Sequence, residues 1–297
     1  MGQRKRLQDL TIKDSFMFGA VMCDEENCKE FLEIALGISI ESVTVSKEKS
    51  IVYHPEYKGV RLDVFAKDEK RTHYNIEMQI SKKPALGKRT RYYHSQLDME
   101  MLESGSHYSE LPDAYVIFIC DYDPFGMGRY RYTWDRICRE EPMLGLLDGS
   151  HTIIFSTCGR DVKNVPEQLV NFLRYVGEER NTCKGEYEDA YVRKIQASVE
   201  HIKTSREMEA RYMLWKEMIQ EEREEAKQEG RVEGRAEGRA EGRAETYREL
   251  ILEYISEFME NIPEELKQRL LEENDPEVLK AYLRKARHFT TIEEFIK

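Results

Sequence analysis

The stretch that decides the fold is Gly59-Val60-Arg61-Leu62-Asp63-Val64 together with Tyr74-Asn75-Ile76-Glu77-Met78-Gln79. In each segment apolar residues alternate with the others, over 60–66 and over 74–80. A period of two is typical of β-strands. The segment 67–71 between them is fully charged and has the length of a hairpin loop, so we expect two antiparallel strands.

One face of this predicted hairpin carries polar side chains, namely Arg61, Asp63, Glu77 and Gln79. If the loop is centred near Glu69, Asp63 faces Asn75 or its neighbour and Glu77 lies one diagonal step away, roughly 7–8 Å between strand positions. Two carboxylates at that separation can reach one ion. Mg²⁺ favours carboxylate oxygen, water and phosphate, and it can activate water for attack on phosphorus. The hairpin therefore favours phosphodiester hydrolysis, with ordinary surface acids as the alternative interpretation.

A basic stretch follows the hairpin and consists of Lys82, Lys83, Lys88, Arg89 and Arg91, with no acidic residue between Ser81 and Leu97. The formal net charge of −11 argues against general binding of polyanions, because phosphate affinity grows with the number of Lys and Arg contacts. A contact with nucleic acid would therefore be local. A solvated charged face is the alternative reading of this stretch.

The rest of the first 180 residues mixes strands and helices. We expect helices at 11–36, divided near 24–27, at about 84–103 and at 166–175, and further strands at 43–53, 114–120, 130–134 and 152–156. The continuous apolar run 114–120 should be buried on both faces of a sheet. This order indicates an α/β domain over 1–180, with a mixed central sheet flanked by helices.

The remaining residues are predicted to be helical. We expect a long helical arm at 181–228 and a small helical segment at 246–297. Between them lies a repeat of Glu-Gly-Arg-(Ala or Val) at 229–245. Glycines and like charges four residues apart weaken a helix. The glycines also form a smooth stripe that a second helix can approach, so we weigh a dimer through the C-terminal helices against a flexible tether. No apolar run reaches 18 residues, and we expect no membrane span and a cytoplasmic location.

Asp63, thirteen intervening residues and Glu77-Met78-Gln79 resemble the PD-(D/E)XK nuclease pattern. The chain is further similar to the recombination-promoting nuclease and putative transposase branch of that superfamily, through Ile12-Lys13-Asp14-Ser15-Phe16, Arg61-Leu62-Asp63-Val64, Asn75-Ile76-Glu77-Met78-Gln79, Arg91-Tyr92-Tyr93-His94-Ser95 and the repeat. The resemblance implies a restriction-endonuclease-like core followed by a helical C-terminal extension.

It also implies roles for single residues. Asp63 and Glu77 become metal ligands, with the backbone carbonyl of Met78 as a third. Gln79 becomes a catalytic residue at the position of the superfamily's lysine, where an amide orients water or phosphate without adding charge. Asp14 and Arg61 would support the site, although a helix-start role suits Asp14 equally well. The identity of the base stays open. Metal-bound hydroxide is the first candidate, and Lys82, Lys83 or Lys88 could supply the positive charge that Gln79 lacks.

The function that follows is a DNA endonuclease dependent on Mg²⁺ or Mn²⁺. Arg89 and Arg91 would grip the DNA backbone together with Lys82, Lys83 and Lys88, and Tyr92 or Tyr93 would pack on a sugar or in the core. No sequence-reading motif is evident, so we expect little sequence specificity. The alternatives are a catalytically weak or inactive scaffold that binds DNA or assembles through its tail, and an RNA nuclease.

Overall fold

The structure of the protein is a computed structural model, which describes residues 5–47, 50–51, 60–178, 187–258 and 262–287. The chain forms two compact units, Met1–Trp215 and Lys216–Lys297. The strands of the first unit are β1 (Val43–Lys47), β2 (Ser50–Ile51), β3 (Val60–Arg61), β4 (Val64–Asp68), β5 (His73–Gln79), β6 (Ala114–Cys120), β7 (Arg131–Trp134) and β8 (Ser150–Ser156). Its helices are α1 (Ser15–Met22), α2 (Glu25–Leu36), α3 (Leu86–Met101), α4 (Glu167–Gly177) and α5 (Ala190–Thr204), with short 3₁₀ turns at Leu7–Asp9 and Tyr108–Glu110.

Six strands form one mixed sheet in the order β1-β4-β5-β6-β8-β7. The ladders β1–β4, β4–β5 and β7–β8 are antiparallel, whereas β5–β6 and β6–β8 are parallel. The strands β2 and β3 pair separately with each other. Since β5 and β6 lie in the middle of the sheet, their side chains are buried on both faces.

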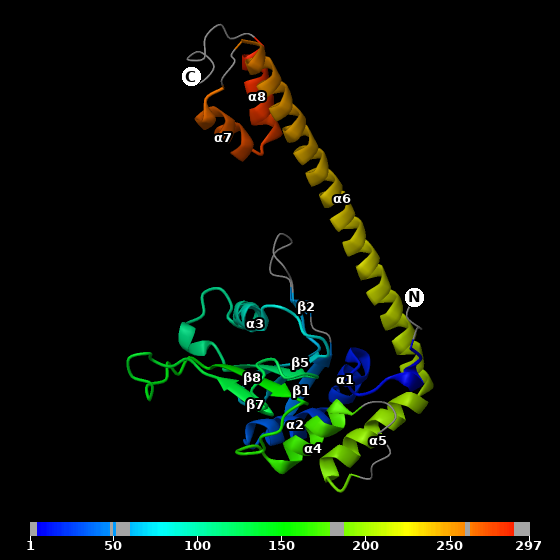
Figure 1. The fold of residues 1–297 in the computed structure, drawn as a ribbon. Helices are drawn as coiled ribbons and strands as arrows, with labels where there is room; N and C mark the ends of the chain where they lie inside the picture. Colours follow the sequence, from blue (N-terminus) through cyan, green and yellow to red (C-terminus); the bar gives the residue numbers. More distant parts are fainter. Residues whose placement is uncertain (1–4, 48–49, 52–59, 179–186, 259–261, 288–297) are drawn as a thin grey trace. The chain divides into compact units, whose positions relative to one another are not determined.

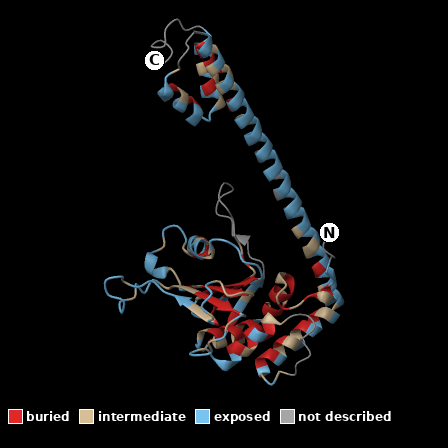
Figure 2. Ribbon diagram, viewed as in Figure 1, coloured by how far each residue is buried: buried red, intermediate tan, exposed pale blue. Residues whose placement is uncertain are grey.

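Helices cover both faces of the sheet (Figure 1). The larger apolar cluster joins one face to α1, α2, α4 and α5, and it includes Phe18, Phe31, Ile76 and Phe172. A smaller cluster joins the opposite face to α3 and includes Phe65, Leu97 and Phe118. Figure 2 shows the buried residues concentrated in the sheet and in the helices packed on it. The predicted α/β fold, with a mixed central sheet flanked by helices, is confirmed.

Most predicted elements occur within a few residues of their expected bounds. The helix predicted at 11–36 divides at Asp24, whose side chain accepts a hydrogen bond from the Asn27 amide and caps α2. Gly37 ends α2 in the left-handed conformation, at φ +70°. The strand predicted at 43–53 is described only as β1 and β2, and its positions 48–49 and 52–53 lie outside the described residues.

The predicted arm differs from the observed structure in its first half. Helix α5 packs in the core of the first unit through Tyr191, Ile195 and Val199, because its apolar residues recur at helical spacing. Helix α6 (Arg206–Phe258) then runs for 53 residues and includes the whole repeat. In the second unit, the end of α6 packs with α7 (Glu264–Glu272) and α8 (Pro276–Ala286) around Ile251, Ile255, Leu270 and Leu279.

Candidate active site

The strand that carries Asp63 is interrupted at that residue. β3 ends at Arg61, β4 begins at Val64, and Asp63 occupies a bend between them. The expectation of one continuous strand over 60–66 was therefore wrong. Leu62 packs in the smaller apolar cluster and Val64 in the larger one. Residues two apart on a regular strand would point to the same face, so the bend at Asp63 reverses the direction of the side chains.

The register of the hairpin also differs from the expected one. Phe65 lies opposite Asn75 and Val64 opposite Ile76, so Asn75 is not the partner of Asp63. The turn is centred on Lys70 rather than Glu69, because the Asp68 carboxylate accepts hydrogen bonds from the Lys70 and Thr72 amides at 2.9 and 2.8 Å. Continued by one position, this register brings Asp63 directly opposite Glu77 instead of diagonal to it.

Two hydrogen bonds with backbone donors orient the carboxylates of Asp63 and Glu77. The Asp63 amide donates to Glu77 Oε1 at 3.2 Å, and the Met78 amide donates to Asp63 Oδ2 at 3.0 Å. Each carboxylate is therefore oriented by the neighbouring strand. The bend frees the Asp63 amide from the ladder for this role, which explains why two acidic side chains converge here.

Electrostatics at Glu77 reflect this crowding. The side chain is only 5% exposed. Burial raises the pKa of Glu77, and the nearby Asp63 carboxylate raises it further, whereas the hydrogen bond from the Asp63 amide and the charge of Arg89 lower it. The balance is a raised pKa. A positive ion next to both carboxylates would relieve their repulsion.

The two carboxylates line one pocket of about 290 Å³, here called the carboxylate pocket. Its walls come from the start of α1, the bend after β3, the end of β5 and the first turns of α3. The lining residues are Ser15, Arg61, Asp63, Glu77, Met78, Gln79, Ile80, Ser81, Lys83, Arg89 and Tyr93. Three of them carry positive charge, so acidic and basic groups share a single cavity.

The predicted site residues divide into two groups. Arg61, Asp63, Glu77, Met78, Gln79, Lys83 and Arg89 line the carboxylate pocket. Lys82, Lys88 and Arg91 are exposed and do not line it. Asp14 does not line it either, since its carboxylate accepts hydrogen bonds from the Thr11 amide at 2.8 Å and from Lys5 Nζ at 2.5 Å.

Sequence reasoning left the site role of Tyr93 open and missed Ser15. The Tyr93 hydroxyl lies 3.5 Å from Glu77 Oε2, and it accepts a hydrogen bond from Arg89 at 3.2 Å. The spacing of four residues between Arg89 and Tyr93 on a helix was the available signal. Ser15 opens α1 beside the pocket, and no sequence pattern distinguishes it from an ordinary helix-start serine.

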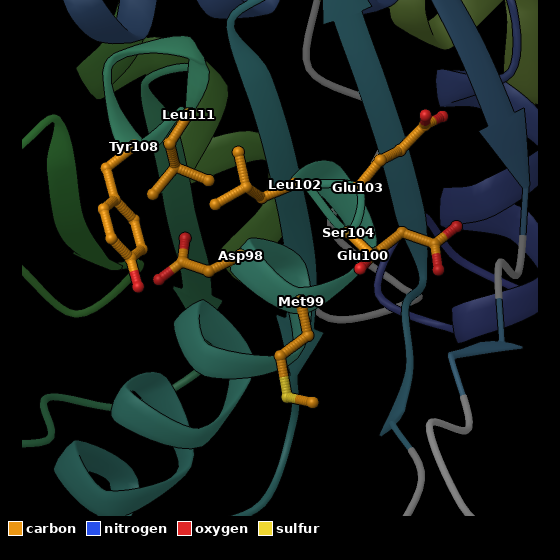
Figure 3. A pocket seen from close by; sticks show the side chains of 8 residues that line it. All are labelled: Asp98, Met99, Glu100, Leu102, Glu103, Ser104, Tyr108 and Leu111. Atoms are coloured by element: carbon orange, nitrogen blue, oxygen red, sulfur yellow. The ribbon is translucent and has the colours of Figure 1, made fainter. Parts of the chain in front are cut away.

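A second pocket, of about 720 Å³, lies at the end of α3 and contains none of the predicted site residues. Its acidic side chains do not converge, because the carboxylates of Glu100 and Glu103 point away from that of Asp98 (Figure 3). Size alone therefore does not identify the site, and the carboxylate pocket is the better candidate on chemical grounds.

The donor set of the carboxylate pocket fits a hard divalent cation. Among the described residues no group of three or more His, Cys, Asp and Glu is arranged so that it could hold a metal ion. Mg²⁺ is commonly bound by one or two carboxylates, with water and substrate phosphate completing its shell. Asp63 and Glu77 supply that minimum, and the pocket supplies space for the other ligands.

The first unit thus combines a mixed α/β sheet with two carboxylates that converge at the end of the β4–β5 hairpin. Residues 12–135 match the family model described as PD-(D/E)XK nuclease family transposase. The resemblance predicted from the sequence is thereby confirmed, over a segment that holds every residue of the carboxylate pocket. No curated protein and no solved structure matches the chain. Within the described part of the chain, no helix is both long enough and apolar enough to cross a membrane.

Proposed function

We propose that this protein is a DNA endonuclease of the recombination-promoting nuclease and putative transposase type, dependent on Mg²⁺ or Mn²⁺ and with little sequence specificity. The observation that supports it most directly is the convergence of Asp63 and Glu77 in a pocket that also contains Lys83 and Arg89. The family match supports nuclease chemistry and DNA as the substrate class.

In this proposal Asp63, Glu77 and the Met78 carbonyl hold the cation, which when bound lowers the pKa of water and neutralises charge at the phosphate. The hydrogen bonds between Asp63, Glu77 and Met78 fix the two carboxylates before any ligand arrives. Lys83 and Arg89 attract the phosphate, and the exposed Lys82, Lys88 and Arg91 extend the contact along the backbone. Phosphate contacts carry no sequence information, which accords with loose specificity.

The decisive test uses variants that remove charge and keep shape. Asp63→Asn and Glu77→Gln retain an oxygen that accepts the same backbone hydrogen bonds, so the fold should persist. We expect each to lower the rate of plasmid nicking in Mg²⁺ by about 10²- to 10³-fold or more, as for other groups that act on the transition state. Single-stranded DNA and RNA assayed in parallel give the substrate preference.

Asp98→Asn is the matched control, because it removes a carboxylate from the second pocket. It should nick at the wild-type rate. Nicking by Asp63→Asn and Glu77→Gln at that same rate would refute the assignment, and faster cleavage of RNA than of DNA would make the protein an RNA nuclease.

A scaffold function is the second candidate, and Gln79 is the observation that favours it. Its amide carries no charge and is engaged by Arg89 and by the Ser81 carbonyl. A scaffold should bind DNA without taking up Mn²⁺ at Asp63. Calorimetric titration of wild type and Asp63→Asn with Mn²⁺ separates the two functions, since the nuclease requires binding that the variant loses.

We further propose that two chains associate through the C-terminal helices, which would allow two sites to act on two strands. The repeat lies within α6, and an added Cβ at Gly230, Gly234, Gly238 or Gly242 would meet no atom within 4 Å. These glycines are exposed, and in the sequence they alternate with Glu and Arg that could pair between chains.

A further inference from the structure

The amide of Gln79 is occupied at both ends by protein partners. Its Oε1 accepts a hydrogen bond from Arg89 at 2.6 Å, and its Nε2 donates to the Ser81 carbonyl at 2.5 Å. The side chain is 5% exposed. Ser81 fixes which end of the amide presents oxygen, and that oxygen is directed at the guanidinium. The Gln79 side chain therefore holds the Arg89 guanidinium in place.

Arg89 is held on its other sides by aromatic residues. Its guanidinium carbon lies 5.3 Å from the ring centroid of Phe118 and 5.6 Å from that of Tyr93. A further hydrogen bond runs from the guanidinium to the Tyr93 hydroxyl at 3.2 Å. Stacking on aromatic rings and a planar array of donors are properties of arginine that lysine does not share. The guanidinium plane is thus fixed before substrate binds.

The position of this guanidinium relative to the carboxylates suits a phosphate. Arg89 lines the carboxylate pocket, and its partner Tyr93 also reaches Glu77 at 3.5 Å. Lys83 lines the same pocket but is exposed, on a flexible four-carbon stem. A preorganised donor stabilises developing charge better than a mobile one, because it does not have to reorganise during the reaction.

From these contacts we infer that Arg89 is the catalytic cation of the pocket and that Gln79 is a positioning residue that acts through Arg89. This inference rests on the proposed nuclease function and assigns the phosphate contact within it. Arg89 donates to the non-bridging oxygens of the phosphate under attack. The Gln79 side chain orients the guanidinium through its hydrogen bond with Arg89.

A lysine at position 79 would disturb Arg89. The general superfamily pattern has lysine there, yet an ammonium at this position would replace the acceptor that faces Arg89 by a second positive charge. Like charges at hydrogen-bond distance repel, so Arg89 would be displaced. Gln79→Lys should therefore damage the site, although it brings the sequence closer to the general pattern.

The experiment measures plasmid nicking in Mg²⁺ and, separately, the affinity for a fluorescein-labelled DNA duplex in the absence of divalent metal. Arg89→Met should lower kcat by about 10²- to 10³-fold and weaken duplex binding. Arg89→Lys should recover part of the rate, and Gln79→Lys should lose as much as Arg89→Met. Arg193→Met, which removes an exposed arginine on α5, is the control and should match wild type in both assays.

A double-variant comparison separates positioning from a purely structural role. If Gln79 acts through Arg89, adding Gln79→Met to Arg89→Met should cause no further loss of kcat, whereas independent roles would multiply the two losses. Gln79→Met also keeps the test valid where Gln79→Lys does not fold. Thermal unfolding of each variant shows whether a loss of kcat reflects a loss of structure.

Nicking by Gln79→Lys at or above the wild-type rate would overturn the inference, as would multiplied losses in the double variant. The proposed function fails in a different way, through a wild-type protein that cleaves no nucleic acid in Mg²⁺ or Mn²⁺. In that event duplex binding decides the role of Arg89. Binding by Arg89→Met as tight as that of wild type rejects a phosphate contact by Arg89, and weakened binding supports that contact.

Discussion

At the scale of single residues, burial changes the pKa of His94. His94 lies on α3 and packs against β8, with Nε2 3.0 Å from the Thr152 hydroxyl. Burial lowers the pKa of His94 to about 4, and the charge of Arg136 contributes in the same direction. The folded protein therefore holds His94 in its neutral form at neutral pH.

This shift predicts a dependence of stability on pH. The folded-state pKa lies below the unfolded value of roughly 6.5, so the unfolded chain binds more protons between those values. The free energy of unfolding should fall as pH drops from about 6.5 to about 4, by on the order of 3 kcal/mol. Urea unfolding at pH 7.5, 5.5 and 4.5 measures it.

His94→Gln should flatten that part of the pH dependence relative to wild type. His107→Gln, which changes an exposed histidine, should leave it unchanged. Equal pH dependence in wild type and His94→Gln would show that the imidazole is not the responsible group.

The proximity of Asp63 and Glu77 was predictable from sequence, because the two acids fall in alternating segments joined by a short loop, although Asp63 itself lies in a bend before β4. The engagement of Gln79 by Arg89 was not predictable. It depends on where α3 begins, and that point is set by Ala85, which adopts a left-handed backbone at φ +60° immediately before Leu86. No residue pattern indicates an alanine in that conformation. The direction of the Arg89 side chain therefore required the structure.

At the scale of elements, helix α6 shows that glycine does not by itself end a helix. The four repeat glycines lie within a continuous helix, although each costs about 1 kcal/mol relative to alanine. Four such costs in one helix indicate that the absence of side chains at these positions has a function. The proposed contact between two chains would be such a function.

Substitution of Gly234 and Gly238 by alanine tests this element. Because nothing lies within 4 Å of an added Cβ, each change should stabilise the helix by about 1 kcal/mol and raise the midpoint of its thermal unfolding by circular dichroism. In a dimer packed along the glycine stripe, the methyl groups would push the helices apart and light scattering would give the mass of one chain.

Two results would count against the proposed contact. A wild-type protein with the mass of one chain would exclude a stable dimer, and a dimer that survives both alanines would place the contact elsewhere. Arg235→Lys keeps the charge of the repeat and adds no methyl group to the stripe, so it serves as the control.

Strands and helices with a clear period were predictable, and those shaped by tertiary contacts were not. Strand β6 has its predicted bounds. A strand buried on both faces appears in the sequence as a continuous apolar run, which can be recognised without knowing its neighbours. The interruption before β4 was not predicted, because apolar and other residues continue to alternate in the sequence through Asp63. The packing of α5 in the core of the first unit was not predicted. The sequence of an amphipathic helix shows which of its faces is apolar but not which surface of the protein that face contacts.

At the scale of the whole molecule, the first unit extends beyond the predicted boundary at residue 180 to Trp215. The start of α6 contributes Tyr212, which is 5% exposed and lies 5.0 Å from Phe16 between ring centroids. Trp215 lies 5.6 Å from Phe16, and the Tyr212 hydroxyl donates to the Lys5 carbonyl at 3.1 Å. The finer division of the C-terminal region into three parts stays a prediction.

These contacts predict where the chain can be shortened. A chain of residues 1–215 should fold with nearly full stability, whereas a chain of residues 1–204 should lose roughly 3–5 kcal/mol, since it lacks the buried aromatic ring of Tyr212. Guanidinium unfolding of the two chains measures the difference. Equal stability would mean that the start of α6 is dispensable for the first unit.

Strand β5 interleaves two kinds of residue along its length. Tyr74, Ile76 and Met78 face the larger apolar cluster, and Asn75, Glu77 and Gln79 alternate with them. Because successive side chains point to opposite faces, inserting or deleting one residue in β5 would exchange the two sets. Insertions and deletions are thus a route of change closed to this strand, and its chemistry can diversify only by substitution at fixed positions.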